Sequence, residues 1–136
     1  MTDVLELLHK EKCSCVIAQG EDVRFFHQRG VADLYRLVCS DSAFLKGAVM
    51  ADKVVGKAAA ALMIKGELKS LYADVISVPA LDLLQEHGVQ VEFGMSVPHI
   101  INRTRTGWCP LEQLCYTETS VDTMFAIISE FIKQHA

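Results

Sequence analysis

Residues 47–65, GAVMADKVVGKAAAALMIK, form the longest apolar-rich run in the chain and decide its fold class. Val54, Ala58 and Leu62 recur at the spacing of one helical face. The alanines at 58–61 favour a helix and have almost no side chain, so other elements can approach closely on several sides. A helix that is apolar nearly all round is usually buried. The stretch is therefore predicted to be one buried central helix.

Three charged residues, Asp52, Lys53 and Lys57, fall in the first half of this predicted helix. Lys53 and Lys57 are four residues apart and would share a face. Gly56 in mid-helix costs about 1 kcal/mol against alanine, which a close backbone or ligand contact would explain. The charges either mark a solvent-facing edge or stand at the mouth of a pocket, where a helix N-terminus attracts anions.

The composition predicts one soluble globular domain, residues 1–136, with room for a sizeable core. A formal net charge of −4 argues against general nucleic-acid binding. No apolar run reaches the length of a membrane span, and the N-terminus has acidic residues where a signal peptide has basic ones. We expect a cytoplasmic protein that does not bind membranes.

The five cysteines are odd in number and show no C-x-x-C spacing, so reduced thiols are expected. Cys13 and Cys15 are two residues apart and would share one face of a strand, where free cysteine packs as a small hydrophobe.

Elsewhere, hydrophobic periodicity and turn residues give a clear order of elements. Ser77 is well placed as the N-cap of a helix, with Pro79 in its first turn. Strands separated by helices imply parallel pairing. The prediction is an α/β domain with three αβα layers and a mixed sheet. Its elements are a helix (2–12), a β-hairpin (13–28), a helix (32–39), the central helix, a strand (68–76), a helix (78–87), a strand (89–93), a short helix (109–116) and a last helix from 119 or 120.

The segments GAVMADKVVGKAAA, YADVIS and VPHIINRTRTGWCPLE, within residues 47–112, carry a family resemblance. Together with the order hairpin, helix, strand, helix, strand, they resemble a small prokaryotic family of uncharacterised proteins with a cytidine-deaminase-like fold. The resemblance covers about residues 1–116. It implies a pocket at the start of the central helix and, because related folds often pair, a homo-oligomer.

True zinc deaminases begin the first core helix with H-A-E or C-A-E and the second with P-C-x-x-C. Laid on this chain, Met50 takes the place of the first ligand, and Ala80 and Leu83 take the places of the two cysteines. None of them is a good zinc ligand, and only the acid remains, as Asp52. The resemblance therefore implies the scaffold without the metal, and no zinc-dependent deamination is expected.

The loop before Cys109 is the second candidate site. It gathers His99, Asn102, Arg103 and Arg105 in an otherwise acidic chain. Arginine forks match phosphate geometry, and long polar loops often carry function. The loop leads into a helix start, which suggests a phosphate site. The alternative is a surface loop whose arginines pair with neighbouring acids.

Cys109 is the third candidate. It precedes Pro110, and Glu112 follows at capping-box distance, so Cys109 is predicted near an N-cap. A helix N-terminus and arginines lower a thiol pKa, which would make a nucleophile with His99 as a partner. The alternative is a small buried hydrophobe beside Trp108.

Other polar residues give weaker signals. Ser77 lies beside the predicted pocket rim and is kept as a ligand-binding candidate. No G-x-G-x-x-G or P-loop motif occurs, so no cofactor is expected. Four histidines show no metal-ligand spacing and are expected at the surface: His9, His27, His87 and His135.

Three functional hypotheses follow. In the first, the domain binds a nucleotide-like or phosphorylated small molecule without a metal. Asp52, Lys53 and Lys57 would line one side of the site, and the anion would be held by Asn102, Arg103, Arg105 and the helix start at Cys109. In the second, it is an enzyme that uses Cys109 as a nucleophile or Asp52 as an acid or base. In the third, it is a non-catalytic interaction module. The sequence does not decide whether the chain is an enzyme.

Overall fold

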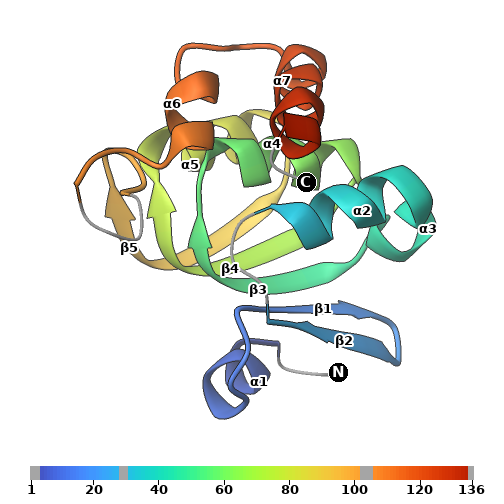
Figure 1. Ribbon diagram of the computed structural model, residues 1–136. Helices are drawn as coiled ribbons and strands as arrows, with labels where there is room; N and C mark the ends of the chain where they lie inside the picture. Colours follow the sequence, from blue (N-terminus) through green and yellow to red (C-terminus); the bar gives the residue numbers. More distant parts are fainter. Residues whose placement is uncertain (1–3, 28–30, 102–105, 135–136) are drawn as a thin grey trace.

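The computed structural model describes residues 4–27, 31–101 and 106–134, and a mixed five-stranded sheet organises them (Figure 1). The elements in chain order are α1 (Val4–Lys10), β1 (Cys15–Gln19), β2 (Asp22–Phe26), α2 (Ala32–Ser40), α3 (Ser42–Leu45), β3 (Val49–Val55), α4 (Lys57–Lys65), β4 (Ser70–Ser77), α5 (Val78–Glu86), β5 (Gln90–Val97), α6 (Pro110–Cys115) and α7 (Val121–Gln134).

The strand order is β2-β1-β3-β4-β5. β1 pairs antiparallel with both β2 and β3, whereas β3, β4 and β5 run parallel. The hairpin turns through Gly20, whose φ of 59° suits a residue without a side chain. The α/β class and the mixed sheet are as the sequence predicts.

Helices cover the two faces of the sheet unequally (Figure 1). α1 packs on β1 and β3 from one side, where Val4 and Leu8 meet Val16 and Ala51 in a small core. The other helices lie on the opposite face and enclose the larger core. α4 lies at the centre of this layer and contacts α2, α5, α6 and α7. The alanines at 58–61 are all buried there, as their small size predicts.

The prediction of one helix over 47–65 is wrong. Residues 49–55 form the strand β3, Gly56 is extended with φ −101° and ψ −179°, and the helix begins only at Lys57. A central parallel strand is buried on both faces and reads as a continuous apolar run, which periodicity cannot distinguish from a helix. Asp52 and Lys53 therefore belong to a strand, and Lys57 alone of the three charged residues belongs to the helix.

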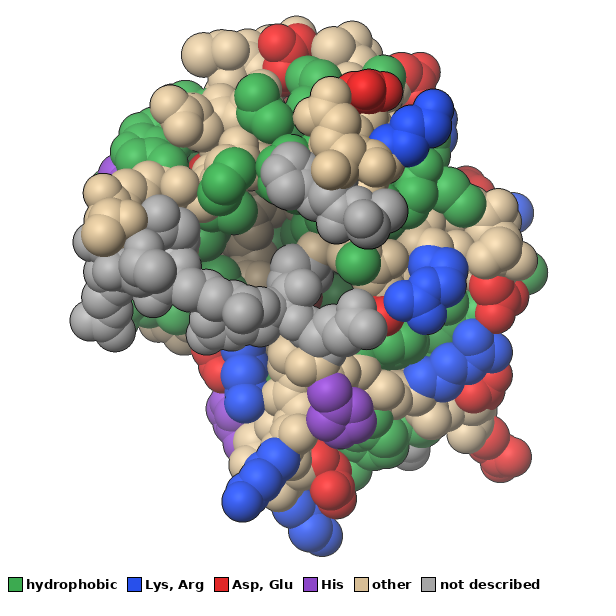
Figure 2. Space-filling view, in the orientation of Figure 1, with side chains coloured by type: hydrophobic (Ala, Val, Ile, Leu, Met, Phe, Trp, Pro, Cys, Tyr) green, Lys and Arg blue, Asp and Glu red, His purple; other side chains and the backbone are tan. Residues whose placement is uncertain are grey.

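The other predicted elements agree with the structure within a few residues. The largest difference is β5, which continues through Gly94 to Val97 where an irregular segment is expected. None of the helices among the described residues is long and apolar enough to cross a membrane. Side chains of opposite charge are interspersed on the face shown in Figure 2.

Candidate functional site

The carboxyl ends of β3, β4 and β5 meet at one edge of the sheet, where α4 and α5 begin. In parallel α/β sheets this edge is the usual place for a ligand. The first turn of each helix has backbone N–H groups without partners inside the helix, and α5 has one fewer because Pro79 has no N–H. How those groups are satisfied decides what the edge can bind.

The N-terminus of α4 is occupied by a carboxylate of the protein itself. Glu112 of α6 is 1% exposed. Its Oε1 accepts the Lys57 backbone N–H at 2.8 Å, and its Oε2 accepts the Ile100 N–H at 2.8 Å. A Cβ on Gly56 would lie 3.4 Å from Oε2 and 3.2 Å from the Ile100 side chain, so the glycine permits this close approach. The start of α4 thus already has an anionic partner within the protein.

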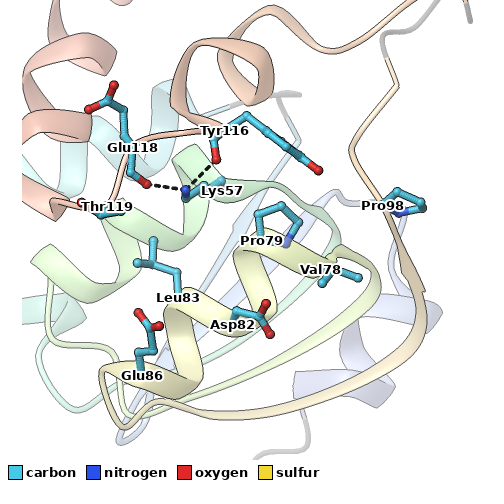
Figure 3. A pocket seen from close by; sticks show the side chains of 10 residues that line it. All are labelled: Lys57, Val78, Pro79, Asp82, Leu83, Glu86, Pro98, Tyr116, Glu118 and Thr119. Carbon is cyan, nitrogen blue, oxygen red and sulfur yellow. Dashed lines mark hydrogen bonds between the residues drawn. The ribbon is translucent and has the colours of Figure 1, made fainter.

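The Lys57 side chain is buried beside this cap, at 8% exposure. Its ammonium donates to the carbonyl oxygen of Tyr116 at 2.8 Å and to that of Glu118 (Figure 3). Neither partner is a carboxylate, so the charge is compensated by backbone dipoles at the end of α6. An ammonium has three N–H donors, and these two carbonyls use two of them.

A cleft of about 520 Å3 opens next to Lys57. Its walls are one side of α5 from its first residue to its last, the segment joining α6 to α7, and Pro98 after β5 (Figure 3). Asp82 and Glu86 are exposed, four residues apart on α5, and place two carboxylates along one wall. The lining residues are Lys57, Val78, Pro79, Asp82, Leu83, Glu86, Pro98, Tyr116, Glu118 and Thr119.

The N-terminus of α5 is capped locally. Ser77 is fully buried, and its hydroxyl accepts the Ala80 N–H at 3.3 Å, as the sequence predicts. Pro79 stands in the first turn and lines the cleft. Ala80 and Leu83, at the positions of the zinc-binding cysteines in the deaminase pattern, are buried. Ser77 therefore shapes the start of α5 and has no exposed surface toward the cleft.

Asp52 lies apart from the cleft lining, opposite Cys15 in the β1–β3 ladder. It is partly buried, and burial raises its pKa from 3.8 to about 7 against the opposing effect of hydrogen bonds from the Val54 and Lys53 N–H groups. Burial also raises the pKa of the Cys15 thiol, with Asp52 a lesser cause. Lys53 is exposed and does not share a face with Lys57, which corrects the helical prediction.

Cys109 is partly buried at the N-cap of α6, as predicted, but this helix has only six residues. The backbone N–H of Cys109 donates to the carbonyl oxygen of Ile100 at 2.9 Å. The expected partner, His99, instead stacks on Trp108, with ring centroids 3.9 Å apart, and Trp108 meets Tyr116 edge-on at 4.7 Å. This aromatic row reaches the cleft through Tyr116.

Asn102, Arg103 and Arg105, the predicted phosphate ligands, lie outside the described residues. Within the described part of the chain, no group of three or more His, Cys, Asp or Glu side chains could hold a metal ion.

Sequence reasoning missed Glu112, Tyr116, Asp82 and Glu86. The spacing of Cys109 and Glu112 did signal a cap, but it pointed to the wrong helix, because a capping box assumes a partner within the same turn. Asp82 and Glu86 carried the usual signal of two acids four residues apart on a helix.

The fold and the cleft define a mixed α/β domain with a small-molecule-sized cleft at the carboxyl edge of its parallel strands. The model of the family described as "TM1506: Domain of unknown function (DUF1893)" matches residues 3–132, and the chain belongs to this family. A crystal structure of a DUF1893 family protein (TM1506) from Thermotoga maritima is similar with a TM-score of 0.85 and 26% identity, covering 93% of this chain and 85% of that one. No curated protein matches the sequence significantly.

Proposed function

We propose that this protein binds a nucleotide-like small molecule in the cleft beside Lys57, on a cytidine-deaminase-like scaffold that uses no zinc. The observation that carries the proposal is the Lys57 ammonium, which lines the cleft although it is buried and has no carboxylate partner among the described residues. Its third N–H would donate to an acceptor on the ligand. A volume of about 520 Å3 is in the range of small-molecule sites.

The opposite wall favours a ligand with N–H donors. Asp82 and Glu86 are acceptors when ionised, and both are exposed at the cleft. Val78, Leu83 and the proline rings supply apolar surface between the two polar ends. A planar ring with a carbonyl at one edge and an amine at the other, as in a nucleobase, matches this arrangement of donor, apolar wall and acceptors.

A phosphate group does not suit the described walls, because two carboxylates there would repel it. The candidates for the phosphate of a nucleotide remain Arg103 and Arg105 in the loop before Cys109, which the sequence predicts as phosphate ligands. The proposal therefore assigns the base to the cleft and the phosphate to the loop.

Calorimetric titration with nucleosides and their monophosphates tests both parts. Lys57→Met and Asp82→Asn should each weaken binding of the base about tenfold, which corresponds to one lost hydrogen bond to a charged group. Lys53→Met is the matched control and should leave the affinity unchanged, because Lys53 is exposed and outside the cleft. Arg103→Ala should weaken nucleotides but not nucleosides.

Failure of every nucleoside and nucleotide to bind the wild-type protein would reject the proposal. Because Asp82 is exposed, Asp82→Asn should fold normally, so the test does not depend on the stability of the Lys57 variant.

A second candidate is enzymatic use of Asp52 or Cys109. The observation that favours Asp52 is its pKa of about 7, which suits an acid–base group at neutral pH. Selective alkylation of Cys109 at neutral pH would support the nucleophile, and an inert thiol would count against it. If the protein converts any ligand found by calorimetry into a product, and Asp52→Asn abolishes this conversion, the acid–base role of Asp52 is supported.

A further inference from the structure

The two outer strands of the sheet, β2 and β5, differ in how they are protected against pairing with a strand of another chain. β2, at one edge, has five residues and carries Arg24, which pairs with Asp22 at 3.0 Å and with Asp41 at 2.8 Å. Charged side chains and short length are the devices by which edge strands avoid pairing with other chains. β5, at the other edge, has eight residues and no lysine, arginine or proline.

β5 also exposes large apolar side chains. Six of its eight residues are exposed, Phe93 to 41% and Met95 to 59%. Among the described residues, β4 is its one strand partner. A long, exposed, apolar edge strand is a template for another strand. The partner must supply an extended segment with apolar residues at alternate positions.

The sequence of β5 suits antiparallel pairing with a second copy of the same strand. Residues 91–97 read VEFGMSV, so an antiparallel second copy with its two-fold axis at Gly94 places Val91 opposite Val97 and Phe93 opposite Met95. All four of these apolar residues then lie on one face of the joined strands. Val91 already packs against the main core, so the new apolar stripe continues that core.

The same register suits the polar face. Glu92 lies opposite Ser96, and the two Glu92 side chains do not face one another directly, which would be unfavourable. Moving the axis by half a residue would place Glu92 opposite Met95, so the apolar pairs and the charge both favour the axis at Gly94.

We propose that two copies of this chain pair through β5, antiparallel and centred on Gly94, so that their sheets become continuous. The pairing is stabilised by backbone hydrogen bonds along the edge and by the cross-strand pairs of Phe93 with Met95. This inference is independent of the ligand proposed for the cleft.

Sedimentation and light scattering of the purified chain test the proposal. We expect a particle of twice the chain mass of 15.1 kDa. Met95→Lys should shift it to the single-chain mass, and its far-UV circular dichroism should be unchanged because the side chain is already exposed. Phe25→Lys on the other edge is the matched control, since Phe25 is 38% exposed, and it should remain dimeric.

A cross-linking experiment tests the register. The double variant E92C/S96C should form a disulfide-linked dimer under mild oxidation, because opposed residues of antiparallel strands lie within disulfide reach. E92C alone should not. A monomeric wild-type protein, a dimer that persists in Met95→Lys, or equal cross-linking by E92C alone would each overturn the proposal.

Discussion

The backbone N–H groups at the starts of α4 and α5 find their acceptors in two different ways. Both helices begin at the carboxyl edge of the sheet, and both bring backbone N–H groups that need acceptors. α5 uses Ser77, the residue directly before it, whose hydroxyl accepts the Ala80 N–H. α4 is preceded by Gly56, which has no side chain, and Glu112 supplies the acceptor from 55 residues along the chain from Lys57.

The difference lies in what each cap connects. The Ser77 cap stabilises only its own helix. The Glu112 cap joins α4, the segment after β5 and α6, and Lys57 returns two hydrogen bonds to the end of α6. The start of α4 is therefore the point where the separate segments around the cleft are held together, and changes there should have the larger effects.

Removal of the Glu112 carboxylate is expected to have the largest effect on stability. Glu112→Ala leaves the buried Lys57 N–H and the partly buried Ile100 N–H without an acceptor, and it should lower the free energy of unfolding by about 4 kcal/mol. Urea unfolding followed by circular dichroism measures this loss. A loss below that of Ser77→Ala would contradict the proposed difference between the two caps.

The Lys57 side chain should come next. Lys57→Met keeps the length of the side chain but leaves the Tyr116 and Glu118 carbonyls without their donor, at a cost of about 3 kcal/mol. Lys53→Met is the control, because an exposed lysine contributes little. Equal unfolding curves for the two variants would show that the Lys57 contacts do not stabilise the end of α6.

Asp52, in the strand β3 that leads into α4, should make the stability of the protein depend on pH. Its pKa is raised from 3.8 to about 7 in the folded protein, so between those values folding takes up a proton. Stability contributed by this group is therefore lost as the pH rises from 4 to 7. Asp52→Asn should match the wild type near pH 4 and exceed it by about 2 kcal/mol at pH 8, since partial exposure reduces the full linkage.

Unfolding of both proteins at a series of pH values provides the measurement. If the difference in unfolding free energy between wild type and Asp52→Asn does not change with pH, then Asp52 has the same pKa in the folded and unfolded chains, and the prediction is wrong.

The local cap should have the smallest effect. Ser77→Ala removes one hydroxyl acceptor, and it should cost about 1 kcal/mol. Ligand binding in the cleft should be unchanged, because Ser77 is buried and outside its lining. Weaker binding in this variant would mean that the start of α5 also positions the ligand.

Features that depend on neighbours in the chain could be predicted from the sequence. The cap at Ser77, the β-hairpin within residues 13–28 and the last helix are set by residues within a few positions of one another. The boundary at Gly56 could not be predicted, because a buried strand and a buried helix are both continuous apolar runs. Only the pairing of β3 with β1 and β4 distinguishes them.

The candidate site depends almost wholly on distant contacts. Lys57 could be identified as a charged residue near a helix start, but its burial and its carbonyl partners come from the end of α6. Asp52 could be identified as an acid, but its raised pKa comes from the burial that the sheet imposes.

The sequence by itself determined the α/β class, the order of most elements and the small-residue helix at the centre, because these follow from local propensity and periodicity. Tertiary structure decided which end of each element faces the cleft, which carboxylate caps α4 and which strand is left at the edge. Those are contacts between residues far apart in the chain, and no local pattern encodes their distances.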